Sequence, residues 1–169
     1  MAEKKKIVVS DAAPLIQLTL VHSLELLPRL YDVIIPEEVF DESQHYRELP
    51  DAMEIAKAVG KWLVVKTVKN RKEVNRLVEQ KLGEGEAEAI VLCKEIGADS
   101  LLTSDKYVAS KAATLGVRTI TIGDVIKEAY NTKTMTAPEV VSLLETLIGQ
   151  NILNTGSLRQ VLREARSWP

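Results

Sequence analysis

Two aspartates follow apolar runs that are typical of buried strands. Asp11 comes directly after residues 7–10, and Asp105 comes directly after residues 101–104. In open parallel sheets, ligands bind outside the carboxyl ends of the strands, so both carboxylates are expected at one edge of a sheet. The simpler interpretation is that each Asp only caps the helix that follows it, and that alternative stays open here.

A glutamate on a short predicted helix points toward the same edge. Glu42 lies three residues after Val39 and seven after Ile35, which places it on the stripe that faces the sheet. A solvated helix end is the simpler interpretation, and Glu38 is an alternative for the same role.

The segment 83–93 alternates acidic and small or apolar residues, and its helical phase separates its acids. Glu86 shares a face with the apolar residues at i+3, i+4, i+7 and i+10, namely Ala89, Ile90, Cys93 and Ile96. Glu84 and Glu88 align instead with Glu95, on a different face from the one that is expected to meet the sheet. A carboxylate on the inward face of a first helical turn needs the helix N-terminus, a partner or a metal to stabilise it.

Together these acids, Asp11, Glu42, Glu86 and Asp105, form what we term the acidic cluster. Carboxylates without His or Cys suit a hard divalent ion such as Mg2+ or Mn2+. Such an ion can deliver a bound water to a phosphodiester. The pattern therefore predicts a metal-dependent nuclease, with these four residues as both the metal ligands and the catalytic residues.

Other chemistries fit the sequence less well. The run that starts at Gly83 lacks the third glycine of a dinucleotide loop, and no strand precedes it. An aspartyl-nucleophile phosphatase would need a second Asp where this chain has Ala13. The lone Cys93 lies on an apolar helical stripe and is interpreted as a core residue.

Composition limits the class of protein. The 169 residues include 22 Lys and Arg against 24 Asp and Glu, so a strongly basic surface for nucleic acid is not expected. Aromatic residues make up 4%, which argues against base stacking on aromatic platforms as the main mode of binding. A single cysteine and an N-terminal apolar run of three residues predict a cytoplasmic protein without a membrane span.

Helices and strands are predicted to alternate along most of the chain, which indicates an α/β fold with a parallel sheet covered on both faces. The five predicted strands are 7–9, 33–35, 62–68, 100–103 and 118–122. A first helix is predicted directly after the first strand, with Pro14 in its first turn. The other predicted helices are 23–30, 37–42, 51–59, 70–82, 84–96, 105–115, 137–148 and 157–166. We expect a single domain over 1–169, with a core of about 6–130 and a C-terminal helical extension of about 131–169.

Four stretches in this order resemble the PIN-domain ribonucleases, in particular a prokaryotic PIN-like subgroup of toxin-antitoxin type. They are 7–18 (IVVSDAAPLIQL), 34–42 (IIPEEVFDE), 83–90 (GEGEAEAI) and 98–105 (ADSLLTSD). The resemblance implies a three-layer fold with a five-stranded parallel sheet, and Mg2+ or Mn2+ held by Asp11, Glu42, Glu86 and Asp105. It also implies RNA as substrate, an antitoxin partner and a homodimer. Ala13 departs from the family, in which Ser, Thr or Asn often supports the metal site at that position.

The sequence therefore predicts a divalent-metal-dependent endoribonuclease. The alternative is a catalytically silent PIN-like module that binds a protein or RNA partner, which Ala13 favours and the retention of four acids disfavours. The last helix leaves a similar choice open. Its basic stripe of Arg159, Arg163 and Arg166 is either a solvated face or a contact for RNA or a protein.

Overall fold

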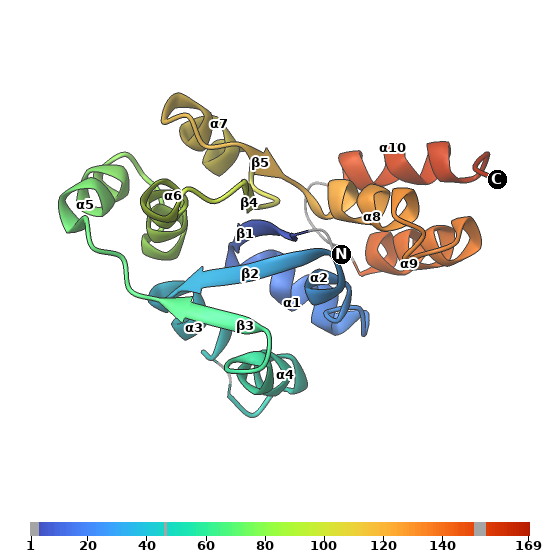
Figure 1. Ribbon diagram of the computed structural model, residues 1–169, viewed down its shortest axis with the longest axis horizontal. Coiled ribbons are helices and arrows are strands. Elements are labelled where there is room, and N and C mark those ends of the chain that lie inside the picture. Colours follow the sequence, from blue (N-terminus) through green and yellow to red (C-terminus); the bar gives the residue numbers. More distant parts are fainter. Residues whose placement is uncertain (1–3, 46, 151–154) are drawn as a thin grey trace.

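The computed structural model describes residues 4–45, 47–150 and 155–169. Its centre is a five-stranded parallel sheet in the order β3-β2-β1-β4-β5 (Figure 1). The strands are β1 (Lys6–Ser10), β2 (Tyr31–Pro36), β3 (Leu63–Lys66), β4 (Ser100–Leu102) and β5 (Thr119–Ile120). The predicted α/β class and all five strands are confirmed.

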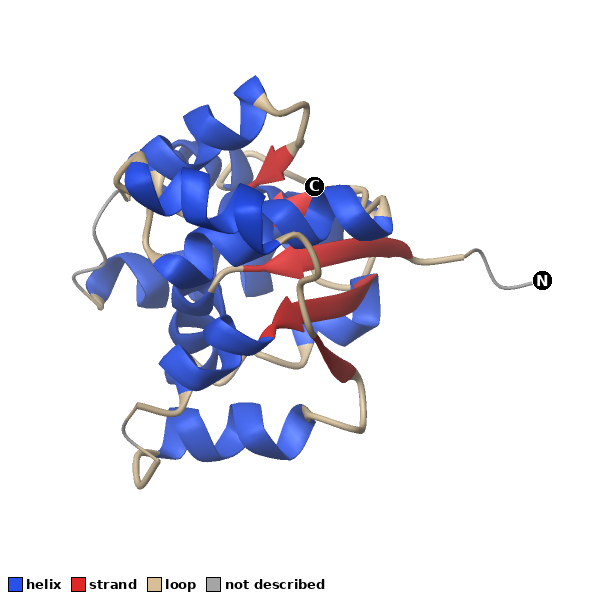
Figure 2. Ribbon diagram, turned by 90° about the vertical axis from the view of Figure 1, so that its left-hand side faces the viewer, coloured by secondary structure: helices blue, strands red, loops and turns tan. Residues whose placement is uncertain are grey.

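Residues of the adjacent strands β1 and β4 are buried because helices cover both faces of the sheet (Figure 2). Val9 of β1 pairs with Leu101 of β4, and both side chains are fully buried. This explains why these strands are continuous apolar runs rather than alternating patterns.

Ten helices are described in residues 4–45, 47–150 and 155–169. They are α1 (Ala12–Leu20), α2 (Leu26–Leu30), α3 (Glu37–Ser43), α4 (Pro50–Ala58), α5 (Arg71–Glu79), α6 (Glu84–Ile96), α7 (Lys106–Thr114), α8 (Ile122–Asn131), α9 (Ala137–Gly149) and α10 (Gly156–Ala165). Gly97 ends α6 with a φ of 62°, a left-handed conformation that favours glycine. Helix α4 begins at Pro50, one residue before its predicted start, and a proline is well suited to the first position of a helix.

Helix α8 was not predicted, and it shortens the last strand. The Thr121 side chain accepts a hydrogen bond from the Asp124 backbone N–H, and the Asp124 carboxylate accepts one from the Thr121 N–H. This reciprocal pair is a capping box, which starts a helix at Ile122 where the sequence pattern predicts strand.

The C-terminal helices α8, α9 and α10 lie together at one end of the molecule (Figure 1). Leu158 and Val161 of α10 are buried. The Tyr130 and Trp168 rings stack at 4.3 Å between centroids and join the last residues to α8. Part of the predicted connection at 149–156 lies outside the described residues. Among the described helices, none has the length and apolar character needed to cross a membrane.

Candidate functional site

Asp11 lies at the carboxyl end of β1 and caps α1. Its Oδ1 accepts a hydrogen bond from the Ala12 N–H at 2.9 Å, and the residue is only 7% exposed. Burial raises the pKa of Asp11 to about 6, and the negative charges of Glu86 and Asp105 add to this rise against the opposing effect of the Ala12 hydrogen bond. The carboxylate therefore lies in a place that favours a neutral group or a nearby cation.

Thr103 joins the two strand-end aspartates, and the sequence analysis did not identify it. Its hydroxyl donates to Asp11 Oδ2 at 3.4 Å and accepts from the Asp105 N–H at 3.2 Å. The side chain is 2% exposed. A hydroxyl residue two positions before a strand-end Asp is the pattern that would have identified it.

Glu42 reaches from the last turn of α3 to the first turn of α6. Its Oε1 accepts a hydrogen bond from the Gly85 N–H at 3.2 Å. Partial burial, followed by the charge of Asp11, raises the pKa of Glu42 to about 7, while the Gly85 hydrogen bond opposes this rise. Glu86 adds a further repulsive charge. Asp11, Glu42 and Glu86 are thus close enough to repel one another.

Glu86 and Asp105 both serve as helix caps. Glu86 Oε1 accepts from the Gly83 N–H at 2.7 Å, which closes the N-terminus of α6. Asp105 Oδ1 accepts from the N–H groups of Tyr107 and Val108, which closes the N-terminus of α7. Asp105 therefore caps α7, and its second carboxylate oxygen makes no hydrogen bond to the described residues.

The acidic cluster shares one feature. Three of its four carboxylates accept a hydrogen bond from a backbone N–H in the first turn of a helix: Asp11 in α1, Glu42 in α6 and Asp105 in α7. Glu86 accepts one from the N–H of Gly83, the N-cap residue of α6. Helix N-termini carry partial positive charge, which stabilises the neighbouring carboxylates. The negative charges of the four acids at this edge of the sheet are therefore only partly balanced by the helix N-termini.

The donor set suits a hard divalent ion, because it consists of carboxylate oxygens that repel one another. No three His, Cys, Asp or Glu side chains of the described residues, however, lie at a spacing that could hold a metal ion. The structure thus brings suitable ligands to one edge without arranging them as a coordination shell.

Glu88 lies on a different face of α6 from Glu86, and it is buried. Glu88 is 6% exposed and forms an ion pair with Arg71 at 2.6 Å. The face that Glu88 shares with Glu84 and Glu95 contacts α3 and α5, and we call it the polar seam. Glu88 is buried in this seam, whereas Glu84 and Glu95 are exposed. The predicted difference in helical phase is nevertheless visible, because Glu86 and Glu88 contact different partners.

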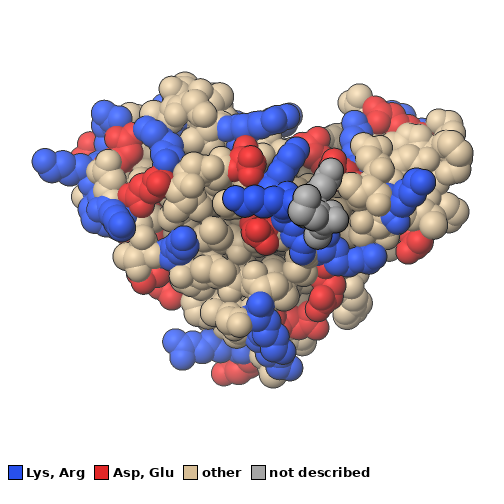
Figure 3. Space-filling view, viewed as in Figure 1, with Lys and Arg blue, Asp and Glu red and all other residues tan. Residues whose placement is uncertain are grey.

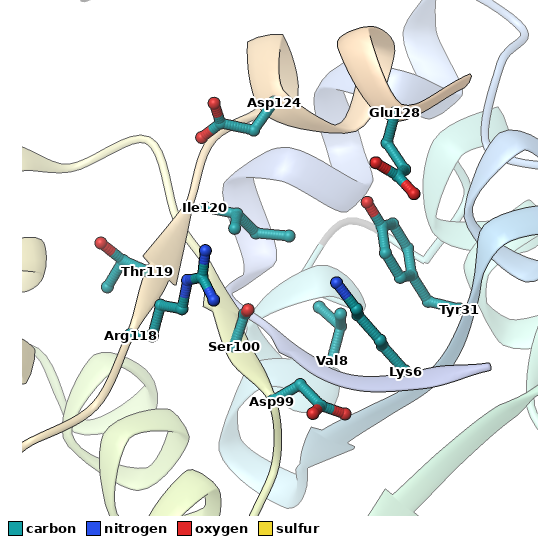
Figure 4. Close-up of a pocket in the computed structure, with 10 residues that line it drawn as sticks. All are labelled: Lys6, Val8, Tyr31, Asp99, Ser100, Arg118, Thr119, Ile120, Asp124 and Glu128. Carbon is teal, nitrogen blue, oxygen red and sulfur yellow. The ribbon is translucent and has the colours of Figure 1, made fainter. Parts of the chain in front are cut away.

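The structure also has a cavity of about 420 Å³, whose lining residues are drawn in Figure 4. Its lining includes Lys6, Tyr31, Ser100 and Thr119, which are the first residues of four strands. It therefore opens at the amino ends of the strands, whereas Asp11 follows a carboxyl end. The cavity is not part of the candidate site.

The surface shows no continuous basic field on the face drawn in Figure 3, where cationic and anionic side chains are interspersed. Cys93 is buried, and burial raises the pKa of its thiol to about 12. This agrees with its interpretation as a core residue and gives it no place at the acidic cluster.

Comparison with known proteins gives one family. A family model described as a PIN domain matches residues 7–167. Among solved structures, a PilT N-terminus domain protein from the hyperthermophilic archaeon Sulfolobus solfataricus P2 is similar, with a TM-score of 0.49 and 20% identity over 73% of this chain and 92% of that chain. No curated protein matches the chain.

Proposed function

Because the chain belongs to the PIN-domain family, we propose that it is a divalent-metal-dependent endoribonuclease whose acidic cluster holds Mg2+ or Mn2+. PIN domains are generally nucleases that use divalent metals. The observation that carries the proposal is the repulsion within the acidic cluster. The charges of Glu86 and Asp105 raise the pKa of Asp11 beyond the effect of burial, and the charge of Asp11 does the same for Glu42. A divalent cation would remove that repulsion.

The roles of the residues follow from their positions. The ion would be held by the carboxylate oxygens of the acidic cluster, Asp11, Glu42, Glu86 and Asp105. The Thr103 hydroxyl would fix the position of Asp11 relative to Asp105. When bound, the ion would lower the pKa of a water molecule and stabilise charge on the leaving oxygen of the phosphodiester. No side chain is needed as the nucleophile in this scheme.

A catalytically silent module is the second candidate. It is favoured by Ala13 and by the absence of an assembled coordination shell among the described residues. We extend the main proposal to a cytoplasmic toxin that acts on RNA, forms a homodimer and is inhibited by an antitoxin protein. This extension rests only on the family resemblance.

Calorimetric titration with Mn2+ separates the two candidates. The wild type should bind Mn2+, Asp11→Asn should lose most of that affinity, and only the wild type should cleave RNA. An exposed aspartate away from the cluster supplies the matched control, so Asp32→Asn should bind like the wild type. Absence of Mn2+ binding by the wild type would reject the nuclease and leave the module.

A further inference from the structure

Helix α6 connects to two other helices through carboxylates on its polar seam. Glu88 Oε1 accepts a hydrogen bond from the Glu38 N–H at 3.2 Å, at the start of α3. Glu95 accepts from the N–H groups of Lys69 and Asn70, just before α5. Both glutamates thus satisfy backbone donors that the two shorter helices leave free at their N-termini.

Glu88 is the buried member of this seam, and it has a charged partner. Arg71 Nη1 lies 2.6 Å from Glu88 Oε2, while Arg71 Nη2 lies 2.9 Å from Glu84 Oε1. The Glu84 side chain is 54% exposed and that of Glu88 is 8% exposed. One arginine therefore pairs with both acids, and Glu88 is the one of the two acids whose side chain is shielded from water.

The same two helices, α3 and α6, meet again at the acidic cluster. Glu42 at the end of α3 accepts from the Gly85 N–H at the start of α6. The hydrogen bond from the Glu38 N–H to Glu88 fixes the first turn of α3. The hydrogen bond from the Gly85 N–H to Glu42 depends on the position of the last turn of α3. Since α3 has only seven residues, a shift of its first turn moves Glu42 as well.

We propose that Glu88, paired with Arg71, is a positioning residue that fixes α3 against α6 and so sets the place of Glu42 in the acidic cluster. This inference rests on the proposed role of Glu42 as a metal ligand. Glu88 itself touches neither metal nor substrate. Loss of supporting contacts of this kind typically weakens metal binding by 10- to 100-fold.

Three substitutions on α6 test the proposal by Mn2+ calorimetry. Glu88→Ala removes the acceptor for the Glu38 N–H and should weaken Mn2+ binding by about tenfold or more. Glu88→Gln keeps an acceptor oxygen and should restore most of the affinity. Glu84→Gln removes the exposed charge paired with the same arginine and should leave affinity unchanged. Equal losses in Glu88→Ala and Glu84→Gln would overturn the proposal.

A double-mutant cycle distinguishes positioning from general destabilisation. If Glu88 acts through Glu42, Glu88→Ala should add almost no further loss of Mn2+ affinity in a Glu42→Gln background. A merely structural role would weaken binding in both backgrounds by the same factor, and that result would reject the proposal.

A measurement without metal tests the positioning role of Glu88 independently of the proposed nuclease activity. Amide hydrogen exchange of Gly85 should speed up about tenfold in Glu88→Ala, because Glu42 no longer reaches its N–H, and should stay near the wild-type rate in Glu84→Gln. If the wild type binds no Mn2+ but Gly85 responds in this way, the nuclease is rejected and the positioning contact stands. Unchanged Gly85 exchange in Glu88→Ala rejects the positioning contact whatever the metal result.

Discussion

Gly85 and Glu42 approach so closely that only a residue without a side chain fits between α6 and the Glu42 carboxylate. The Gly85 N–H donates to Glu42 Oε1 at 3.2 Å, and a Cβ atom at Gly85 would lie 2.7 Å from the Glu42 carboxyl carbon. All three atoms nearest to that Cβ belong to the end of the Glu42 side chain. A methyl group here would therefore displace Glu42 rather than the backbone.

Gly85→Ala should keep the fold but weaken Mn2+ binding and RNA cleavage by at least tenfold, since the Glu42 carboxylate must move. Melting temperature, calorimetry and cleavage assays measure the three quantities. Gly149→Ala is the control, because it adds a Cβ to α9 with no atom within 4 Å. It should raise stability by up to about 1 kcal/mol without affecting the metal. Unchanged Mn2+ affinity in Gly85→Ala would argue against Glu42 as a ligand.

The metal-free protein should lose stability as the pH rises from about 4 to 7. The pKa of Asp11 rises from 3.8 to about 6 on folding, so the folded state holds its proton more tightly than the unfolded state. The resulting stability is fully present below pH 3.8 and disappears as the pH passes 6, a change of the order of 3 kcal/mol. Glu42 acts in the same direction up to about pH 7.

Denaturant unfolding at several pH values, with Asp11→Asn as reference, measures this effect. The difference in unfolding free energy between the two proteins should shift in favour of Asp11→Asn as the pH rises. A pH-independent difference would mean that Asp11 does not carry the repulsion.

Asp11→Asn should raise the metal-free melting temperature at pH 7.5, because an amide keeps the oxygen that accepts from Ala12 and removes a buried charge. Asp105→Asn should leave it nearly unchanged, because Asp105 is exposed and Asn also caps helices well. Both variants should lose RNA cleavage and most of the thermal shift that Mn2+ gives the wild type. Lower metal-free melting in both would indicate purely structural caps.

Glu86→Gln should reduce metal-dependent cleavage by at least 100-fold while the protein stays folded. The amide oxygen can still accept from the Gly83 N–H, so the cap of α6 survives and only the charge is lost. Kinetics at saturating Mn2+ measure the loss, with Glu84→Gln as the control on the same helical turn. Full activity of Glu86→Gln would show that the third carboxylate is misassigned.

Two sets of substitutions in α10 test separately whether this helix docks on the core and whether it contacts RNA. Val161 is 4% exposed, so Val161→Asp should destabilise the protein by about 3 kcal/mol or more in denaturant unfolding. Neutralising Arg159, Arg163 and Arg166 should change stability by less than about 1 kcal/mol, since the Arg166–Glu145 pair at 3.7 Å is exposed.

The same triple variant also tests the basic stripe of α10. Its RNA affinity should be measured against salt concentration in an Asp11→Asn background, where no cleavage is expected. A shallower salt dependence would assign the stripe to phosphate contact, and an unchanged one would leave it a solvated face.

The strands could be predicted from sequence because each is an apolar run bounded by Gly, Pro or Asp, as at Val9 and Leu101. Helix α8 was missed because its start depends on a reciprocal bond between Thr121 and Asp124, and the apolar residues before it favour strand. That pair is visible in the sequence as a capping box.

The acids of the candidate site could be predicted from their position at strand ends and from helical phase. The residues and helices that surround them could not be predicted. Helical phase separates Glu86 from Glu88 and says nothing of which helices pack on either side. Glu88 is buried because α3 and α5 both contact α6, which only the tertiary structure reveals. The position of Thr103 two residues before Asp105 is visible in the sequence, but its hydrogen bond to Asp11 depends on the pairing of β4 with β1.

Asp11 and Thr103 are 92 residues apart in the chain, although they share a hydrogen bond. During synthesis, Asp11 leaves the ribosome long before β4, which must pair with β1 to bring Thr103 and Asp105 beside it. Contacts between such distant segments form late in folding, because a long loop must close first. The acidic cluster is therefore complete only after most of the chain has been translated, and a nascent chain that ends before β4 carries Asp11 without half of its surroundings.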